Sequence, residues 1–517
     1  MSSTVGIPCL QAGEDVKDLT HCLREAAHSH PRHLFLRTPS GRELTYGQLL
    51  EHSERFAAVL AQLGVVPGDR VAVQVEKSVE AILLYLSCLS LGAVFVPINT
   101  ANTPHEVEYF LSDARPKVAV VDPKRRAALL HCAREAGVAH LETLGESGDG
   151  SLLDLVRRCE ARASSQQALG PADPAAIVYT SGTTGRSKGA MLTRGNLGSN
   201  AAVLAQAWHF VAGDVVLHVL PLFHIHGLFV AINTALAAGA GLLLMTRFDA
   251  GEAIRHLNEC SVFMGVPTHY TRLLQHPDLS RDSTARIRLF VSGSAPLSAE
   301  THMQFLERTG HAILERYGMS ETLIITSNPY EGVRRPGSVG PPLPGIEVRV
   351  AGAASGESVG TLEIRGPNVF AGYWQDAAKT AAEFTPDGWF KSGDMGHIDA
   401  QGYIHIVGRA KDLVITGGYN VYPKEVEAEL DALSGIQESA VFGVPHPDFG
   451  EGVTAAVVIE LNAALSESQI IDAVQSRLAR YKVPKRVLLV DELPRNTMGK
   501  VQKNELRKRF ASLYKIP

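Results

Sequence analysis

The sequence predicts an α/β fold, with a large N-terminal domain of α/β-layered subdomains plus a β-rich subdomain, and a small α+β C-terminal domain. Three observations predict it. The chain has 517 residues, more than one hydrophobic core accommodates. Helical stretches alternate with short β-branched runs from residue 45 to about 260, which favours a mostly parallel sheet covered by helices. Between about 335 and 408, short strand-like runs are interrupted by glycine and proline.

The N-terminal part shows the alternation most clearly. A helix is expected over 46–64, and strands are expected over 70–75 and 117–122. The apolar run 81–99 is typical of a helix that stops at Gly92, followed by a buried strand over 93–97. Its apolar length is below the roughly 20 residues that a membrane helix needs, so we expect no membrane span.

The C-terminal part has its own pattern after the β-rich subdomain. Its 109 residues suffice for a separate small domain, which predicts an N-terminal domain over 1–408 and a C-terminal domain over 409–517. The strands expected in the β-rich subdomain are 346–352, 361–369 and 403–408. The elements expected in the C-terminal domain are helices over 425–433 and 466–482 and strands over 439–445, 454–461 and 487–490.

Charge and cysteine content exclude several classes of protein. The formal net charge of -5 gives no basic footprint for nucleic acid. The six cysteines form no C-x-x-C pair, so free thiols in a reducing compartment are expected. The N-terminus has no basic segment followed by an apolar one, so no secretory signal is expected and the predicted location is cytoplasmic.

The stretch 180-TSGTTGRSKGAM-191 is a candidate phosphate-binding loop. It is not a Walker loop, because Lys188 is followed by Gly189 and not by a hydroxyl residue. Backbone N–H groups at its glycines can still form an anion-binding nest beside the lysine. A flexible surface loop is the alternative on these residues alone. The candidate phosphate ligands are Thr180, Ser181, Gly182, Thr183, Thr184, Gly185 and Lys188.

Further motifs follow this loop in a fixed order, and together they resemble the superfamily of adenylate-forming enzymes. That superfamily includes acyl-CoA synthetases, peptide-synthetase adenylation domains and luciferases. The motifs are 293-GSAP-296, 317-YGMSET-322, 392-SGDMG-396, 408-GRAKD-412, 417-GGYN-420 and 495-RNTMGK-500. The resemblance covers nearly the whole chain. It implies ATP-dependent activation of a carboxylic acid as an acyl-adenylate, with release of pyrophosphate.

The resemblance also implies roles for single residues. Lys500 is implied to contact the substrate carboxylate and the α-phosphate, and Glu321 is implied to bind Mg²⁺, which prefers carboxylate and phosphate oxygens. Without the motifs, Lys500 would be taken for a solvated charge and Glu321 for a helix-cap acid. Catalytic roles are also expected of Thr322 and His224. The implied contacts to AMP are Gly293, Ser294, Ala295 and Tyr317 around adenine, and Asp394 and Arg409 at the ribose.

A second half-reaction is implied in which the thiol of coenzyme A attacks the carbonyl that Lys500 covers. The family resolves this conflict by rotating the C-terminal domain, so this domain is expected to be mobile. Lys411 occupies the matching hinge position. Gly417, Gly418 and Tyr419 are the expected contacts to coenzyme A.

The nearest resemblance is to malonyl-CoA synthetases, through segments such as 221-PLFHIHGLF and 267-PTHYTRLL. It implies that Arg272, at the start of an apparent helix, pairs with the distal carboxylate of malonate, since the guanidinium fork suits a buried carboxylate. A surface arginine is the alternative. The other expected acyl contacts are His224, Met319 and Ile324. Ile324 and Ile325 depart from the Met and Asn expected there, which favours a bulkier diacid such as methylmalonate.

The expected substrates are therefore ATP, coenzyme A and a small carboxylic acid, with Mg²⁺ as cofactor. Two alternatives stay open at this point. The chain could activate another short-chain acid, with Arg272 in a structural role. It could also pass its acyl-adenylate to a carrier protein, although no carrier domain with a phosphopantetheine serine follows residue 517.

Overall fold

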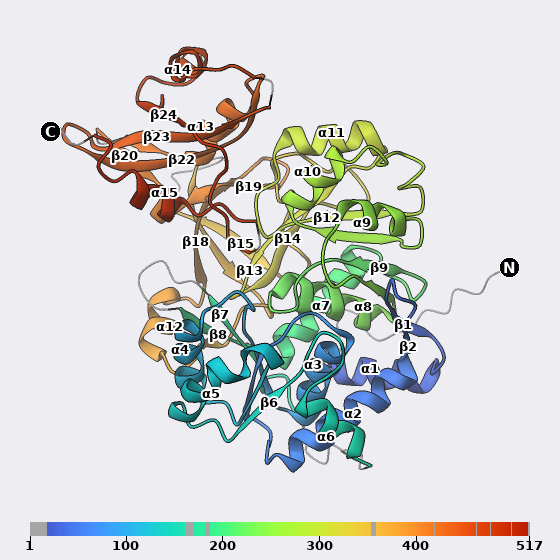
Figure 1. The fold of residues 1–517 in the computed structure, drawn as a ribbon. Coiled ribbons are helices and arrows are strands. Elements are labelled where there is room, and N and C mark those ends of the chain that lie inside the picture. Colours follow the sequence, from blue (N-terminus) through green and yellow to red (C-terminus); the bar gives the residue numbers. More distant parts are fainter. Residues whose placement is uncertain are drawn as a thin grey trace.

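The computed structural model describes residues 18–160, 169–180, 187–352, 358–417, 419–461, 463–475, 477–497 and 499–514 (Figure 1). Two large sheets, a four-stranded sheet and a five-stranded sheet make up its framework. The first three belong to the larger N-terminal part, and the last forms the C-terminal part at the upper left of Figure 1. The α/β prediction is confirmed.

The two large sheets are mostly parallel. The seven-stranded sheet has, in spatial order, β17 (Gly372–Tyr373), β8 (Lys188–Thr193), β7 (Pro174–Thr180), β4 (Val94–Pro97), β3 (Arg70–Gln74), β5 (Val118–Val121) and β6 (His140–Thr143). The eight-stranded sheet has β14 (Leu323–Ser327), β13 (Leu314–Met319), β12 (Leu289–Ser292), β11 (Val262–Gly265), β9 (Val215–His218), β10 (Gly241–Leu244), β1 (Leu34–Arg37) and β2 (Glu43–Thr45).

Strand β3 shows why these strands are apolar throughout. Val71 and Val73 belong to the main core, whereas Ala72 between them belongs to a second core on the opposite face. A parallel strand that is covered on both faces has no solvent-facing side, so it does not alternate with polar residues. The helices packed into the main core include α1 (Leu19–Ser29), α2 (Tyr46–Gln62), α3 (Val79–Leu91), α7 (Arg194–Ala207) and α8 (Asn233–Ala238).

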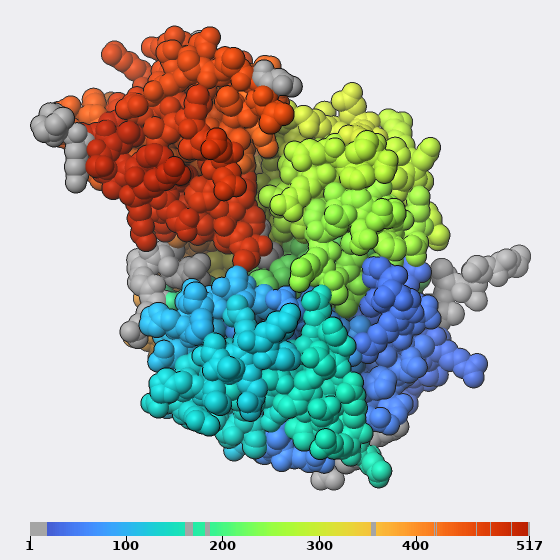
Figure 2. Space-filling model, in the orientation of Figure 1, coloured from blue at the N-terminus to red at the C-terminus, as the bar shows by residue number. Residues whose placement is uncertain are grey.

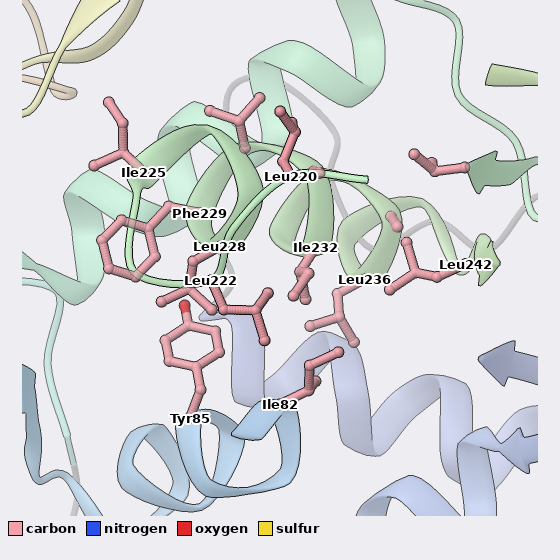
Figure 3. Packing of buried hydrophobic residues seen from close by; sticks show 14 of the residues in the cluster. Ile82, Tyr85, Leu220, Leu222, Ile225, Leu228, Phe229, Ile232, Leu236 and Leu242 are labelled. Carbon is pink, nitrogen blue, oxygen red and sulfur yellow. The ribbon is translucent and has the colours of Figure 1, made fainter. Parts of the chain in front are cut away.

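A π-helical segment, η2 (His226–Ile232), continues directly into α8. Figure 3 shows its residues Leu228, Phe229 and Ile232 packed towards Tyr85 and Ile82 of α3. The hydroxyl of Tyr85 donates a hydrogen bond of 3.0 Å to the side chain of Asn233. This packing fixes the segment that precedes η2, and π-helical turns are frequent at functional sites.

Other helices cover the outer faces of the two large sheets. Helices α4 (Pro104–Ala114) and α5 (Arg126–Glu135) pack on the second core of the seven-stranded sheet. Helices α9 (Ala250–Leu257), α10 (Pro267–Gln275) and α11 (Ala299–Thr309) lie over the eight-stranded sheet (Figure 1). The short helices α6 (Ser151–Arg158) and α12 (Ala377–Glu383) accompany β6 and β17.

The β-rich subdomain is an antiparallel sheet of β15 (Glu347–Ala351), β16 (Gly360–Arg365), β18 (Phe390–Ile398) and β19 (Ile404–Arg409). The C-terminal sheet contains β21 (Tyr419–Val421), β20 (Val414–Thr416), β23 (Gly450–Ile459), β22 (Ile436–His446) and β24 (Arg486–Leu489). Its helices are α13 (Pro423–Asp431), α14 (Glu467–Gln475) and α15 (Lys503–Arg509). The predicted boundary between 408 and 409 falls within β19, and the exact boundary stays a prediction.

Most predicted elements occur where the sequence placed them. The apolar run 81–99 is α3, a left-handed Gly92 with φ of 77°, and β4. The helix predicted over 466–482 was too long, because α14 ends at Gln475. No helix in the described residues is long and apolar enough to cross a membrane. Five of the six cysteines are buried free thiols, and Cys9 lies outside the described residues.

Candidate active site

A cavity of about 950 Å³ lies where the seven-stranded sheet, the eight-stranded sheet, the β-rich subdomain and the C-terminal domain meet. Figure 2 shows the molecular surface hollowed between the red C-terminal domain and the cyan and green parts of the large domain. Predicted site residues from all these parts line the cavity: Thr180, Lys188, His224, Ser294, Met319, Glu321, Arg409, Lys411 and Lys500. Segments far apart in sequence are thus brought to one site.

Strands β18 and β19 place Asp394 opposite Arg409 in the antiparallel register. The Arg409 Nε lies 2.9 Å from Asp394 Oδ1, and the hydroxyl of Tyr317 donates to Asp394 Oδ2. The carboxylate raises the pKa of Arg409, and burial beside it raises the pKa of Tyr317. Arg409 and Tyr317 therefore hold the two carboxyl oxygens of Asp394 in a fixed orientation. The contacts to ribose and adenine stay predictions.

Lys188 begins β8 and follows the candidate phosphate loop. Its Nζ lies 5.4 Å from the centroid of the Tyr373 ring, and the Tyr373 hydroxyl donates a 3.1 Å hydrogen bond to Glu321 Oε1. Burial raises the pKa of Glu321, whose side chain is almost fully enclosed. Tyr373 therefore connects the lysine of the loop to the predicted metal ligand. Ser181, Gly182, Thr183, Thr184 and Gly185 lie outside the described residues.

Lys500 reaches the cavity from the C-terminal domain. Burial, and then the charge of Arg409, lower its pKa to about 8. Burial, the charge of Arg316 and the charge of Lys500 together lower the pKa of His224 to about 4. The catalytic candidate of the C-terminal domain thus lies near candidates from the large domain. The lysine is charged at neutral pH and the histidine is neutral.

The cavity lining also includes Arg316, which strand β13 places next to Tyr317 in the chain. Its side chain is 3% exposed, and its Nε and Nη2 atoms have no hydrogen-bond partner within the described part of the chain. Burial lowers the pKa of Arg316 to about 9. Gly293 makes room for the guanidinium, since a Cβ at that position would lie 2.4 Å from Arg316 Cζ.

His224 and His226 lie close enough to Arg316 for its charge to add to the effect of burial in lowering their pKa values. Burial lowers the pKa of His269 to about 3 and that of His226 well below its usual value. The Nδ1 of His226 lies 3.2 Å from the hydroxyl of Ser294, a non-glycine residue with φ of 70°. Such a backbone conformation is uncommon outside glycine and clusters at functional sites. These neutral histidines leave the positive charge of Arg316 unopposed.

Two buried groups fix the segment that carries His224. The Lys77 Nζ donates to the carbonyls of His218 and Leu220, at 3.3 and 2.9 Å, and burial lowers the pKa of Lys77 to about 7. The His218 Nε2 lies 2.8 Å from the carbonyl oxygen of Gly227. The segment between these contacts is therefore held at both ends, which positions His224 in the cavity.

Several predicted residues do not line this cavity. Arg272 was expected at the start of a helix, but α10 begins at Pro267, so Arg272 falls in its last turn and is exposed. Ile324 is fully buried in the main core, and Thr322 is buried with its carbonyl accepting from Asn368. Ala295 is also absent from the lining. The roles assigned to these residues stay predictions.

Two of the expected coenzyme A contacts, Gly417 and Tyr419, are not among the residues that line the cavity. Gly417 has φ of 58° and ends the strand that pairs with β21. Tyr419 is 58% exposed and stacks on Tyr481 with ring centroids 4.7 Å apart. Gly418 lies outside the described residues. A coenzyme A site at this hairpin therefore requires movement of the C-terminal domain.

Sequence reasoning missed Arg316, Lys77 and Tyr373. The segment 313-ILERYGMSET carries a charged pair inside an apolar strand pattern, and a charge at such a position is buried when the strand is covered on both faces. That signal could have identified Arg316. Lys77 and Tyr373 give no comparable signal, because their partners are contributed by distant segments.

Comparisons with known proteins show which family the chain belongs to. The model of the AMP-binding enzyme family matches residues 23–374, and that of the AMP-binding enzyme C-terminal domain matches residues 425–500. The mitochondrial malonate–CoA ligase of Mus musculus is 35% identical over 90% of this chain and 87% of its own length. A feruloyl-CoA synthase of Amycolatopsis is 35% identical over 91% of this chain and 94% of its own.

A solved structure agrees in fold. The crystal structure of ATP-bound MatB from Rhodopseudomonas palustris aligns with a TM-score of 0.92 and 50% identity, covering 96% of this chain and all of the other. Because one relative is mitochondrial, the cytoplasmic location stays a prediction. The chain belongs to the AMP-binding enzyme family of the adenylate-forming superfamily and is an AMP-forming acid–CoA ligase.

Proposed function

We propose that this enzyme activates malonate or a small substituted malonate such as methylmalonate, with ATP and Mg²⁺, and transfers the acyl group to coenzyme A. One observation carries the proposal. Arg316 is a buried cation that lines the cavity, and no carboxylate in the described residues forms a salt bridge with it. A buried charge is costly unless it is paired. The second carboxylate of a malonate would supply the missing partner.

The fixed geometry suits a short diacid. Arg316, His224 and Lys500 all line the cavity, and after burial the charges of Arg316 and Lys500 lower the pKa of His224 further. A substrate with a carboxylate at each end would therefore place one at Arg316 and the other at Lys500. A guanidinium binds a carboxylate through two parallel hydrogen bonds, which orients the acid as well as holding it. The malonate–CoA ligase of Mus musculus, a relative over most of the chain, supports the same substrate class.

The residues present fit a magnesium ion. The described residues contain no cluster of three side chains that could cage a metal, and Glu321 is the carboxylate in the cavity lining that Tyr373 orients. Mg²⁺ is commonly held by one or two carboxylates together with substrate phosphates and water. Glu321 would hold it, and the ion would neutralise charge on the phosphates of ATP.

The chain's own residues account for the first half-reaction. The substrate carboxylate oxygen attacks the α-phosphate, an acyl–phosphate bond forms, and the bond to pyrophosphate breaks. Lys500 would lie between the two oxyanions and offset their repulsion. Arg409 and Asp394 would hold the ribose, and Lys188 would contact the outgoing phosphates. Neutral His224 would contact the acid without adding a charge of its own.

The second half-reaction requires the lysine to leave. The thiol of coenzyme A attacks the activated carbonyl, the thioester bond forms, and AMP departs with the electron pair of the broken bond. We propose that the C-terminal domain rotates about Lys411, withdraws Lys500 and brings Gly417 to the cavity. The exposed position of Tyr419 supports this proposal, because neither Tyr419 nor Gly417 lines the cavity in the present arrangement.

A substrate panel tests the proposal. Thioester formation is measured with magnesium-ATP, coenzyme A and, in turn, acetate, malonate, methylmalonate, succinate, ferulate and a medium-chain fatty acid. We expect kcat/KM to be highest for malonate or methylmalonate and at least tenfold lower for acetate, which has no group for Arg316. A higher kcat/KM for acetate, ferulate or the fatty acid than for both malonates would refute the assignment.

A further inference from the structure

The turn that carries Lys500 is a preformed unit of the C-terminal domain. The backbone N–H of Asn496 donates to the carbonyl of Lys500, and the N–H of Lys500 donates to the Asn496 side chain, both at 2.9 Å. Arg495 forms an ion pair with Glu438 on β22. These contacts fix the shape of the turn within its own domain, so its place in the cavity depends on what the large domain offers it.

The large domain meets this turn at two points. The Asn99 Nδ2 donates a hydrogen bond of 3.0 Å to the hydroxyl of Thr497. On the other side, Gly499 lies against Thr268 at the start of α10, where an added Cβ would be 2.9 Å from the Thr268 hydroxyl oxygen. The turn therefore sits between the end of β4 in one large sheet and α10 on the other.

Contacts within the large domain fix the orientation of the Asn99 side chain. Its Oδ1 accepts from the N–H of Ala101 at 2.9 Å, and its carbonyl accepts from the side chain of Gln74, also at 2.9 Å. The amide of Asn99 therefore presents its N–H group outwards without help from the C-terminal domain. Asn99 and Thr497 both line the cavity, although neither is predicted to touch substrate.

We propose that Asn99 is a positioning residue that holds the Lys500 turn in the cavity during the first half-reaction and releases it for the second. The inference rests on the domain rotation in the proposed function. A hydrogen bond between two partly exposed neutral groups is weak, so the contact biases the position of the domain without locking it. Its loss lowers the fraction of molecules with Lys500 in place, and leaves the thiol-transfer arrangement unaffected.

The test separates the two half-reactions. Acid-dependent ATP–pyrophosphate exchange measures the first, and thioester formation from supplied acyl-adenylate and coenzyme A measures the second. Asn99→Ala and Thr497→Val are each expected to slow the exchange about 2- to 12-fold, the range for one neutral hydrogen bond. Thioester formation from the adenylate is expected to stay at the wild-type rate. Thr497→Ser, which retains the hydroxyl, is expected to restore the exchange.

A double-mutant cycle gives the sharpest readout. If the two residues act through one contact, the variant with both Asn99→Ala and Thr497→Val loses no more than either single variant. Additive losses, an equal slowing of both half-reactions, or no slowing of the exchange would each overturn the inference. Lys500→Ala is the control. If Lys500→Ala loses the exchange reaction while Asn99→Ala keeps it, the proposed function stands and only the role of Asn99 is removed.

Discussion

The two sides of the cavity are built in opposite ways. On the large domain, Arg316 is enclosed, and the segment that carries His224 is held at both ends by Lys77 and His218. On the C-terminal domain, a single turn carries Lys500 into the same cavity. A side-chain hydrogen bond from Asn99 to the hydroxyl of Thr497 joins this turn to the large domain.

We propose that the enclosed groups of the large domain select the acid, whereas Lys500 of the C-terminal domain takes part in the reaction. Groups that must select one acid benefit from a fixed geometry, because preorganised charges cost no rearrangement when substrate binds. A group that must act in one half-reaction and withdraw in the next needs contacts that break easily. We therefore propose that the large domain supplies the fixed geometry and the C-terminal domain the motion, in agreement with the burial of Arg316 and the partial exposure of the turn near Lys500.

The largest effect is expected from a substitution of Lys500, on the C-terminal side of the cavity. Lys500→Ala should lower acid-dependent ATP–pyrophosphate exchange about 100- to 1000-fold, the usual cost of one lost electrostatic contact in a transition state. Thioester formation from supplied acyl-adenylate should proceed at the wild-type rate, because the lysine has withdrawn by then. An equal loss in both assays would contradict the division between the two sides.

The next largest effect is expected from a substitution of Arg316, on the large-domain side of the cavity. Arg316→Met should raise the KM for malonate about 10- to 150-fold, the range for a hydrogen bond to a charged group, with little change for acetate. Arg272→Met is the matched control, since that side chain is exposed on α10. If Arg272→Met alone reduced selectivity, the distal carboxylate would bind there and not at Arg316. Thermal unfolding would check that the buried substitution leaves the fold intact.

The smallest effect concerns pH. Lys500 has a pKa lowered to about 8 by burial, so it carries its charge below that pH and loses it as the pH rises through 8. The kcat/KM of the exchange reaction should therefore fall about fivefold between pH 8 and 9, since this ratio reports the free enzyme. Lys500→Arg should abolish this fall, because the arginine keeps its proton. Burial brings the pKa of Arg316 only to about 9, so its effect belongs to higher pH.

The helices and strands were predicted correctly where the apolar pattern of a single segment is enough to identify the element. The helix over 46–64 and the run from α3 through Gly92 to β4 needed only apolar periodicity and a glycine stop. It overextended α14, because the polar and apolar spacing of 466–482 continues beyond the last helical turn. Length is set by tertiary contacts that a single segment does not encode.

The site was recovered unevenly for a similar reason. Asp394 and Arg409 meet because β18 and β19 pair them in register, and Lys500 lies near enough to Arg409 for the arginine charge to lower its pKa further after burial. Arg272 lies on an amphipathic helical pattern, and its exposure could not be predicted from spacing. Arg316 lies in an apolar strand pattern that was overlooked, and the packing of Gly293 against it shows that the fold encloses this arginine.

The central claim is that the partner of the buried guanidinium is the second carboxylate of the substrate. A crystal structure of the enzyme with magnesium, AMP and malonate, or with malonyl-adenylate, tests it most directly. The account predicts the distal carboxylate within 4 Å of the Arg316 nitrogens, about the limit for an ion pair, with Lys500 at the activated end. A carboxylate bound at Arg272, or an empty space beside Arg316, would contradict it.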